Sequence, residues 1–291
     1  MSNQSGRLFI VATPIGNLGD ITERAREILA GVDRVAVEDT RHSGRLLAKL
    51  GIRRPLLSVH EHNELSRVDQ VIEKIHGGED IALISDAGTP LISDPGYRLV
   101  KAAKAAAIEV LTIPGPSSVM AALSVSGLPT DRFTFEGFLP ARAAARQRRL
   151  KALARLEQTL VLLEAGRRVP QALHDLAHAL GPNREAALCR ELTKRFETTE
   201  TDTLERLIQW IAADSDRTRG EFVIVVAAGE SANAIEHAEL PPITEILSLL
   251  RHEGLGAKAA ARVAARLTGQ SANALYTLAI AAGSDATKPS D

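Results

Sequence analysis

Short apolar runs alternate with longer amphipathic runs over the first 127 residues of the chain. Apolar runs of strand length and runs with a 3.6-residue period predict strands and helices in turn. The predicted strands are Leu8–Ala12, Arg34–Val37, Pro55–His60, Ile81–Ile84 and Val110–Ile113. The predicted helices are Ile21–Ala30, Ser43–Leu50, Val68–His76, Tyr97–Ala106 and Ser118–Ser126. Strands joined through helices form βαβ units, so we predict an α/β fold with a largely parallel sheet covered on both faces.

The pattern changes after about residue 128, where extended runs follow one another more closely. The predicted extended runs are Arg132–Gly137, Thr159–Leu163, Glu185–Cys189, Phe196–Asp202 and Phe222–Ala227. The predicted helices between them are Pro170–Leu180 and Leu204–Ala213. Because more strands are adjacent in the chain here, we expect a mixed sheet rather than a purely parallel one.

Changes in composition divide the chain into five parts. We predict α/β domains at residues 1–128 and 129–229, then a linker at 230–242 that carries acids, Ser, Asn and a double proline. The Ala- and Leu-rich stretch 243–283 is predicted to be helical, with breaks at Glu253–Gly256 and Gly269–Ser271. Three short helices of this size resemble a helix-turn-helix module. The tail at 284–291 is expected to be disordered.

The overall composition narrows the class of protein. Of the 291 residues, 45% are hydrophobic and 24% charged, as in ordinary globular proteins. A formal net charge of −1 excludes a globally basic nucleic-acid-binding protein but leaves room for a local basic patch. The single cysteine, Cys189, excludes an intrachain disulfide and indicates a reducing compartment. No signal-peptide pattern or bilayer-length apolar run is visible, so we expect a soluble, cytoplasmic protein without a membrane partner.

Two turns rich in Gly and Pro follow consecutive predicted strands. They are Ser85–Gly96, which reads SDAGTPLISDPG, and Pro114–Ser118, which reads PGPSS. Turns with few side chains let a ligand approach main-chain N–H and C=O groups closely. In open parallel sheets, ligands bind outside the carboxyl ends of the strands. Local strand termination explains one such turn but does not predict two in succession, so we predict a ligand site here.

Two other strand ends are less specific. The segment Thr13–Asp20 has glycines only at 16 and 19, so it is neither a G-x-G-x-x-G fingerprint nor a phosphate-binding P-loop. A tight strand-to-helix connector explains this segment as well as a ligand-binding turn does. Glu38 and Asp39 stand where an acid commonly holds a ribose hydroxyl in dinucleotide folds. A helix N-cap at Asp39 or Thr40 is the alternative, but it accounts for only one of the two acids.

Nearby basic and His residues add to this candidate cleft. The guanidinium of Arg41 is suited to bind a phosphate group of a ligand in this cleft. The segment His60–Glu64 contains residue types that ligate transition metals, but no second ligand cluster is obvious. We therefore expect His60 to line the cleft and expect no metal site.

Eight segments, in order along the chain up to Gly229, resemble the tetrapyrrole-methylase superfamily of S-adenosylmethionine-dependent (class III) methyltransferases. They read VATPIGNLGD, VAVEDTRHSG, HEHNE, LISDAGTPLISDPG, IPGPSS, LPTDRFTFEGFLP, LCRELTK and RGEFVIVV. The more similar branch of this superfamily methylates the ribose 2′-hydroxyl of a cytidine in the 16S rRNA of the small ribosomal subunit. The resemblance implies a two-domain tetrapyrrole-methylase-like fold with a small C-terminal helical module. It also implies that S-adenosylmethionine binds in the cleft between the two domains and that the protein is a homodimer.

The resemblance also implies which residues contact the cofactor. They are Gly16, Leu18, Asp86, Ala87, Gly88, Thr89, Ile92, Pro116, Ser117, Ser118, Glu164, Leu192 and Thr193. Two positions depart from the superfamily pattern. Thr89 stands where the superfamily has an aspartate, and the first glycine-rich loop has become Pro14–Gly19.

Methyl transfer to a hydroxyl is helped by a carboxylate or His that removes the hydroxyl proton. Glu38 and Asp39 are the preferred candidates for this base, with Arg41 positioning phosphate and His60 as a further candidate catalytic residue.

Basic side chains in two places are candidates for RNA contact. A basic run follows the FLP segment, and Lys258, Arg262 and Arg266 are spaced by four and so share a helix face. Charge runs are usually solvated helix faces, and contact with RNA phosphates is the alternative. The predicted RNA-binding residues are Arg142, Arg146, Arg148, Arg149, Lys151, Lys258, Arg262 and Arg266.

Three other functions fit part of this pattern. A small-molecule tetrapyrrole methyltransferase shares the catalytic fold but needs neither the basic run nor the helical module. A nicotinamide-dependent oxidoreductase fits the α/β pattern and Glu38, but the G-x-G-x-x-G fingerprint is missing. A non-enzymatic RNA-binding protein would keep the basic surfaces without needing the two Gly- and Pro-rich turns.

Overall fold

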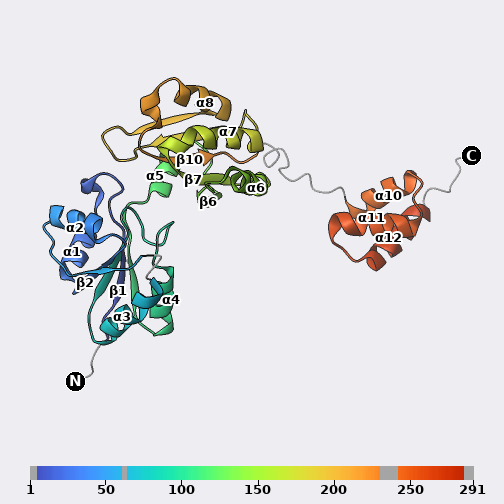
Figure 1. Cartoon of the computed structure of the whole chain (residues 1–291). Coiled ribbons are helices and arrows are strands. Elements are labelled where there is room, and N and C mark those ends of the chain that lie inside the picture. Colours follow the sequence, from blue (N-terminus) through green and yellow to red (C-terminus); the bar gives the residue numbers. More distant parts are fainter. Residues whose placement is uncertain (1–4, 61–63, 230–241, 285–291) are drawn as a thin grey trace, which may run out of the picture. The chain divides into compact units, whose positions relative to one another are not determined.

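The computed structural model describes residues 5–60, 64–229 and 242–284 of the chain. The chain separates into two compact units, residues 1–229 and 230–291 (Figure 1). The predicted linker and tail lie outside the described residues, apart from Pro242 and Ser284 at their edges.

The first half of the first unit is a parallel sheet with strand order β3-β2-β4-β1-β5. Its strands are β1 (Leu8–Val11), β2 (Arg34–Val37), β3 (Leu56–Ser58), β4 (Ile81–Ile84) and β5 (Val110–Ile113). Its helices are η1 (Leu18–Asp20), α1 (Glu23–Gly31), α2 (Thr40–Lys49), α3 (Glu64–His76), α4 (Tyr97–Ala105) and α5 (Ser118–Val125). This arrangement confirms the predicted strands and the predicted parallel sheet.

Alternating strand residues bury both faces of this sheet. Val35 and Val37 of β2 pack with α1 and α2, whereas Ala36 between them packs with α3 and α4. Helix α2 begins at Thr40, three residues before the predicted start, because the Asp39 side chain accepts hydrogen bonds from the backbone N–H groups of Arg41 and His42.

The second half is a mixed sheet with strand order β6-β7-β10-β8-β9, as predicted. Only the β6–β7 pair is parallel; the other pairs are antiparallel. The strands are β6 (Phe133–Phe138), β7 (Thr159–Ala165), β8 (Glu185–Arg190), β9 (Thr198–Thr203) and β10 (Glu221–Val226). The helices are α6 (Ala143–Leu153), η2 (Gly166–Arg168), α7 (Val169–Leu180), α8 (Leu204–Ala212) and η3 (Ser215–Thr218).

The two halves of the first unit share a core through α5. One face of the second sheet is covered by its own helices α6, α7 and α8. The other face packs against Val119, Ala122 and Leu123 of α5, which follows the last strand of the first sheet. Because α5 belongs in sequence to the first half and packs on the second, it joins the two sheets.

The second unit contains α10 (Ile243–His252), α11 (Ala257–Thr268) and α12 (Ala272–Ser284). Its core is small and rich in alanine, with Leu247, Ala260, Ala264 and Leu275 among its buried residues. The helix breaks fall where Gly and Ser interrupt the apolar pattern, as the sequence predicted.

A buried ion pair fixes α6 on α7. The Arg146 Nε donates to Asp175 Oδ2 at 2.6 Å, and both side chains are less than 10% exposed. The Arg146 Nη1 also donates to the carbonyls of Pro140 and Ala141. Gln171 donates to the other Asp175 oxygen at 3.3 Å, so each charge has several partners.

Replacing Asp175 with Leu leaves a buried guanidinium without its carboxylate. We expect a loss of about 3–5 kcal/mol in the free energy of unfolding, measured by urea denaturation. The double variant Arg146→Met/Asp175→Leu should recover much of this loss, and the exposed control Arg148→Ala should stay within about 0.5 kcal/mol of the parent. A single Asp175→Leu variant as stable as the parent would contradict this account.

Candidate functional site

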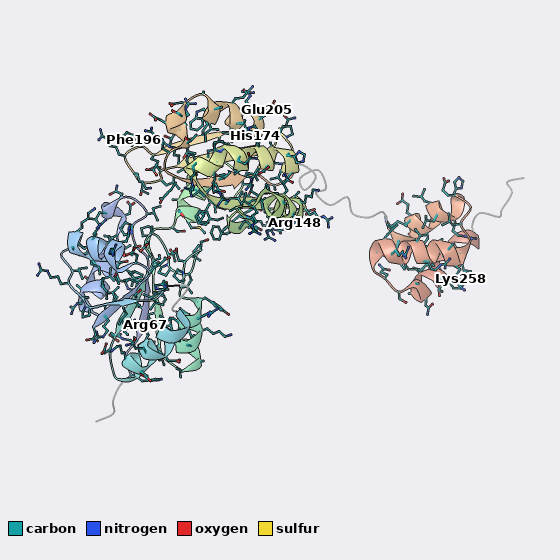
Figure 2. The ribbon with its side chains drawn as sticks, in the orientation of Figure 1. Arg67, Arg148, His174, Phe196, Glu205 and Lys258 are labelled. Carbon is teal, nitrogen blue, oxygen red and sulfur yellow. The ribbon has the colours of Figure 1, made fainter. Side chains whose placement is uncertain are left out.

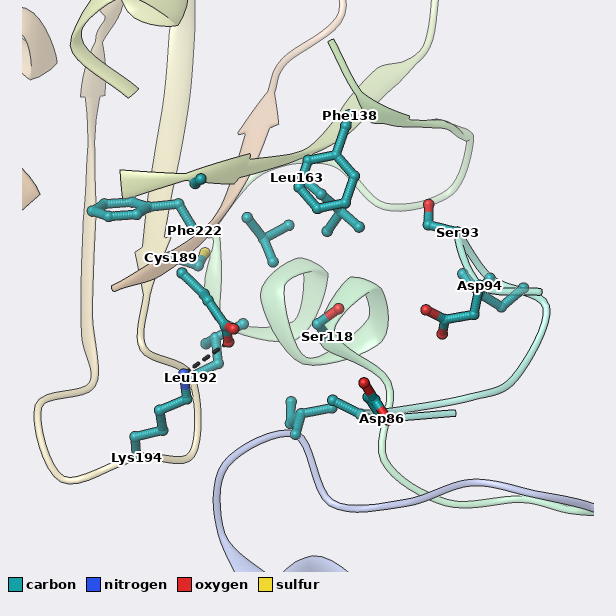
Figure 3. Close-up of a pocket in the computed structure, with 16 residues that line it drawn as sticks. Asp86, Ser93, Asp94, Ser118, Phe138, Leu163, Cys189, Leu192, Lys194 and Phe222 are labelled. Atoms are coloured by element: carbon teal, nitrogen blue, oxygen red, sulfur yellow. Dashed lines mark hydrogen bonds and ion pairs between the residues drawn. The ribbon is translucent and has the colours of Figure 1, made fainter. Parts of the chain in front are cut away.

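A cavity of about 360 Å³ lies between the carboxyl-end loops of the first sheet and one face of the second sheet (Figure 3). Its size is in the range of small-molecule and cofactor sites. The residues lining it from the first half are Ile15, Asp86, Ala87, Ile92, Ser93, Asp94 and Ser118. Those from the second half are Phe138, Leu163, Ala165, Cys189, Leu192, Lys194, Glu221, Phe222 and Val223.

Main-chain hydrogen bonds join the first βα turn to the turn after β4. The Thr13 N–H donates to the Gly88 carbonyl at 2.8 Å, and the Gly88 N–H donates to the Thr13 carbonyl at 3.0 Å. Gly88 has a φ of +82°, and a Cβ there would lie 3.3 Å from Ile15 Cγ2. Both the left-handed backbone and this close approach favour glycine at position 88.

A second contact joins the two Gly- and Pro-rich turns. The Thr89 hydroxyl donates to the Pro116 carbonyl at 3.1 Å, and Thr89 does not line the cavity. The threonine that replaces the superfamily aspartate therefore connects Ser85–Gly96 to Pro114–Ser118 in this chain.

Five of the residues predicted to bind the cofactor line the cavity. They are Asp86, Ala87, Ile92, Ser118 and Leu192. The other eight lie outside its lining: Gly16, Leu18, Gly88, Thr89, Pro116, Ser117, Glu164 and Thr193. Their contact with a cofactor stays a prediction.

Two of these eight have clear local roles. Ser117 is the N-cap of α5, and its hydroxyl accepts from the Met120 N–H at 3.5 Å. Gly16 lies against the loop after β8, where an added Cβ would come within 2.4 Å of Lys194 Cγ and 3.1 Å of the Leu192 carbonyl oxygen. Gly16 thus permits close contact between the two halves at one end of the cavity.

The side chain of Glu164 points away from the cavity. Its neighbours Leu163 and Ala165 line the cavity, and successive strand residues face opposite sides of a sheet. Glu164 is 3% exposed and pairs with Arg168 at 3.1 Å. Burial raises its pKa, although the Ala165 N–H and nearby Arg168 oppose the rise. A cofactor in this cavity would meet the strand at Glu164 through main chain only.

None of the four predicted catalytic residues lines the cavity. Asp39 is exposed and caps α2; the N–H groups of Arg41 and His42 lower its pKa. Arg41 is exposed on the first turn of α2, and His60 is partly buried after β3. Glu38 follows β2 and is close enough to Asp94 for its charge to act there. Much of the segment around His60 lies outside the described residues.

Sequence reasoning missed several residues that line the cavity, chiefly Asp94, Phe138, Lys194 and Glu221. Asp94 lies inside the SDPG part of the predicted ligand turn, and that was the signal available for it. Lys194 Nζ donates to Glu191 Oε1 and Glu221 Oε2, each at 2.8 Å. Burial lowers the pKa of Lys194, but these hydrogen bonds outweigh it and leave the pKa raised.

The basic run forms most of α6, and its residues divide between two faces. Arg146 is 6% exposed and bonded to Asp175, so the prediction that it contacts RNA is corrected to a structural role. Arg148 (Figure 2) and Lys151 are exposed on the opposite face. Arg155, which sequence reasoning missed, is exposed just beyond the end of the helix. Arg142 is also exposed, and Arg149 pairs with Glu136.

In the second unit, Lys258 (Figure 2), Arg262 and Arg266 are exposed on α11, and their spacing by four places them on one face of the helix. Within the described ranges, no helix combines the length and the apolarity that crossing a membrane requires. No group of three or more His, Cys, Asp or Glu suited to a metal ion occurs in the same ranges.

Cys189 is fully buried at the cavity wall, and burial raises the pKa of its thiol to about 11. The thiolate is the reactive form, so a raised pKa depresses reactivity at pH 8 on the order of 10²-fold. We expect a thiol reagent such as DTNB to label native protein at least that much more slowly than protein in urea. Equal rates in the two conditions would contradict the buried, protonated thiol.

Comparisons with known proteins identify the family of this chain. The family model described as Tetrapyrrole (Corrin/Porphyrin) Methylases matches residues 7–208. A Xylella fastidiosa protein called Ribosomal RNA small subunit methyltransferase I is 51% identical over 93% of this chain and 98% of its own length. The Pseudomonas aeruginosa protein of the same name is 49% identical over 95% and 97%.

Solved structures share the fold over about three quarters of the chain. Uroporphyrin-III-C-methyltransferase from Thermus thermophilus has a TM-score of 0.55 at 22% identity, covering 76% of this chain and 94% of that one. Diphthine synthase has a TM-score of 0.58 at 16% identity, covering 76% and 90%. With the family model matching most of the chain and relatives near 50% identity over almost its full length, this chain belongs to the tetrapyrrole methylase family.

Proposed function

We propose that this protein transfers a methyl group from S-adenosylmethionine to the ribose 2′-hydroxyl of a cytidine in the 16S rRNA of the small ribosomal subunit. The rRNA assignment depends on one observation. Two proteins called Ribosomal RNA small subunit methyltransferase I are 51% and 49% identical to this chain over almost its full length. The cytidine, its 2′-hydroxyl and the proposed homodimer come from the motif resemblance. The proposed cytoplasmic location rests on the single cysteine, which indicates a reducing compartment.

Coverage separates this proposal from tetrapyrrole methylation. The uroporphyrin-III methyltransferase covers 76% of this chain. The first unit makes up a similar share of the chain, 79% (229 of 291 residues). The two rRNA methyltransferase relatives cover 93% and 95%, more than the first unit alone can supply. The alignments with the rRNA methyltransferase relatives must therefore extend into the helical unit. This favours RNA over a porphyrinoid as substrate.

The cavity residues fit S-adenosylmethionine. Phe138, Leu163 and Val223 give the side formed by the second sheet an apolar surface suited to an adenine ring. Asp86 Oδ1 is buried with no hydrogen-bond partner, which suits a ligand hydroxyl or ammonium group. The exposed Ala87 in the turn after β4 leaves main chain open to a ligand. We therefore assign the cofactor site to this cavity.

When bound, S-adenosylmethionine supplies an electrophilic methyl group on a sulfonium. The protein's own residues must then orient the ribose, exclude water and accept one proton. Phe138, Leu163 and Val223, which are paired across neighbouring strands and so share a face, provide an apolar wall that excludes water from one side of the cavity. Asp86, Asp94 and Ser118 bring polar groups to the opposite side, where the hydroxyl can be oriented (Figure 3).

Cofactor binding and rRNA methylation together test the proposal. We expect calorimetry to detect S-adenosylmethionine but not NADH, and mass spectrometry to find 2′-O-methylcytidine in 16S rRNA from a deletion strain after incubation with the protein. Methylation of a porphyrinoid but not of rRNA would favour the small-molecule alternative. NADH binding alone would favour an oxidoreductase, and absence of any cofactor affinity would favour a non-enzymatic RNA-binding protein.

The exposed face of α6 should contribute to RNA affinity. We expect Arg148→Ala/Lys151→Ala to weaken rRNA binding and to lower the slope of log K against log salt by about 2, since each lost phosphate contact lowers it by about one. Filter binding over a salt series measures this. The control Arg67→Ala, an exposed arginine on α3, should leave both values unchanged. An unchanged salt slope for the double variant would exclude α6 from the RNA-binding surface.

A further inference from the structure

Resting on the proposed function, we propose that Asp94 is the general base that takes the proton from the attacking ribose hydroxyl, and that Glu38 acts only through Asp94. The assignment moves the base from the end of β2, where sequence reasoning placed it, to the loop after β4. It concerns a residue for which neither sequence pattern nor family resemblance gave a role.

Asp94 lines the cavity, and its carboxylate is turned into it (Figure 3). The Asp86 carboxylate and the Ser118 hydroxyl point toward the same space from the ends of β4 and β5. Asp86 Oδ1 is buried without a partner, so this side of the cavity holds a polar group that requires a ligand donor. A ribose bound here would bring its hydroxyls among these three side chains.

The loop that carries Asp94 is held in place from both sides. Leu91 and Ser93 have φ values of 74° and 66°, a left-handed backbone that costs energy for residues other than glycine. A Cβ on Gly96 would lie 2.7 Å from Leu83 Cδ2, and one on Gly137 would lie 2.9 Å from Ser93 Oγ. The loop is therefore packed against β4 on one side and β6 on the other, which fixes the backbone on either side of Asp94.

The surroundings of Asp94 suit a base that works near neutral pH. Burial and the charge of Glu38 raise its pKa to about 6; a hydrogen bond from Ser85 opposes this and the charge of Asp86 adds to it. Across the cavity, the charged groups are Lys194 and Glu221, which pair with each other at 2.8 Å. A base is most effective when its pKa lies near the working pH, and the carboxylate form predominates at pH 7 and above.

The other two acids are less suited to the role. Asp39 is occupied as the N-cap of α2, and its pKa is lowered, which makes it a weaker base. Glu38 does not line the cavity, so it has no direct route to a substrate there. Its effect on the pKa of Asp94 gives it a positioning role through charge.

The proposed step balances as follows. The O–H bond of the ribose breaks and its proton passes to an Asp94 carboxylate oxygen. The electron pair left on the ribose oxygen forms the new bond to the methyl carbon. The electron pair of the broken carbon–sulfur bond stays on the sulfur of the sulfonium donor, which leaves as a neutral thioether, and Asp94 later releases its proton to water.

Kinetics on rRNA test the assignment with Asp94→Asn, Glu38→Gln and the control Asp69→Asn, which makes the same charge change on the exposed face of α3. We expect Asp94→Asn to lower kcat at pH 8 by about 10²-fold or more while S-adenosylmethionine binding by calorimetry is kept. In the parent, kcat/KM should rise with pH through about 6. Glu38→Gln should move that midpoint to lower pH and cost far less turnover, because it removes a like charge from Asp94 rather than the base itself.

A measurement without any ligand gives a second readout. The folded-state pKa of Asp94 lies above its unfolded value, so ionisation of Asp94 favours unfolding, and this cost appears as pH rises from about 4 through 6. The Tm of Asp94→Asn relative to the parent should therefore increase over that range and level off above it. The difference for Asp69→Asn should stay flat.

Four results would overturn the proposal. They are parent-like turnover in Asp94→Asn, loss of S-adenosylmethionine binding together with turnover, a flat Tm difference, and abolition of turnover by Glu38→Gln. If the parent methylates rRNA and any of these occurs, Asp94 is not the base and the proposed function stands. If the parent methylates no rRNA, the proposed function fails and this assignment fails with it.

Discussion

The paired main-chain hydrogen bonds between Thr13 and Gly88 hold together the two turns on which the cavity depends. They join the end of β1 to the turn after β4, and the Thr89 hydroxyl extends the connection to the turn after β5 through the Pro116 carbonyl. Three loops at the same edge of a parallel sheet are thus fixed to one another mostly through backbone. Such a surface offers preorganised main-chain groups without the conformational entropy of long side chains.

The second sheet completes the site because α5 attaches it to the first. Helix α5 starts at the Ser117 cap beside the cavity and buries Val119, Ala122 and Leu123 against the second sheet. The same helix presents Ser118 to the cavity. One short helix therefore positions a polar group for the ligand and brings the apolar wall formed by Leu163 and Val223 opposite the loops.

Much of the fold could be predicted from the sequence because its signals are local. Strand-length apolar runs with Gly or Pro at their ends located most of the ten strands described, and a polar extended run located β9. The close succession of strands after residue 128 indicated the mixed sheet. The Gly- and Pro-rich turns also located the cavity, since Asp86, Ala87, Ile92 and Ser118 all line it. Asp94 lies between Ser93 and Gly96, whose close contacts with Gly137 and Leu83 depend on glycine. Periodicity could not show that Asp94 faces the same cavity as Leu163.

Side-chain roles that depend on tertiary partners were beyond the sequence. Arg146 looked like its basic neighbours, and only the position of Asp175 on α7 shows that it is an internal ion pair. Glu164 lies at a strand end next to the cavity, as predicted for a cofactor contact. Only the positions of Leu163 and Ala165 in the cavity lining show that its side chain faces the other side of the sheet. Glu38 and Asp39 were adjacent acids in sequence, and the hydrogen bonds of α2 separate the capping acid from the one that acts on Asp94.

A crystal structure of the protein with S-adenosylmethionine tests the central claim most directly. The account predicts the donor in the cavity between the two sheets, with the turn at Ala87, the Ser118 hydroxyl and Leu163 in contact with it. A donor bound anywhere else on the first unit, or a cavity closed by the side chains that line it, would contradict the account.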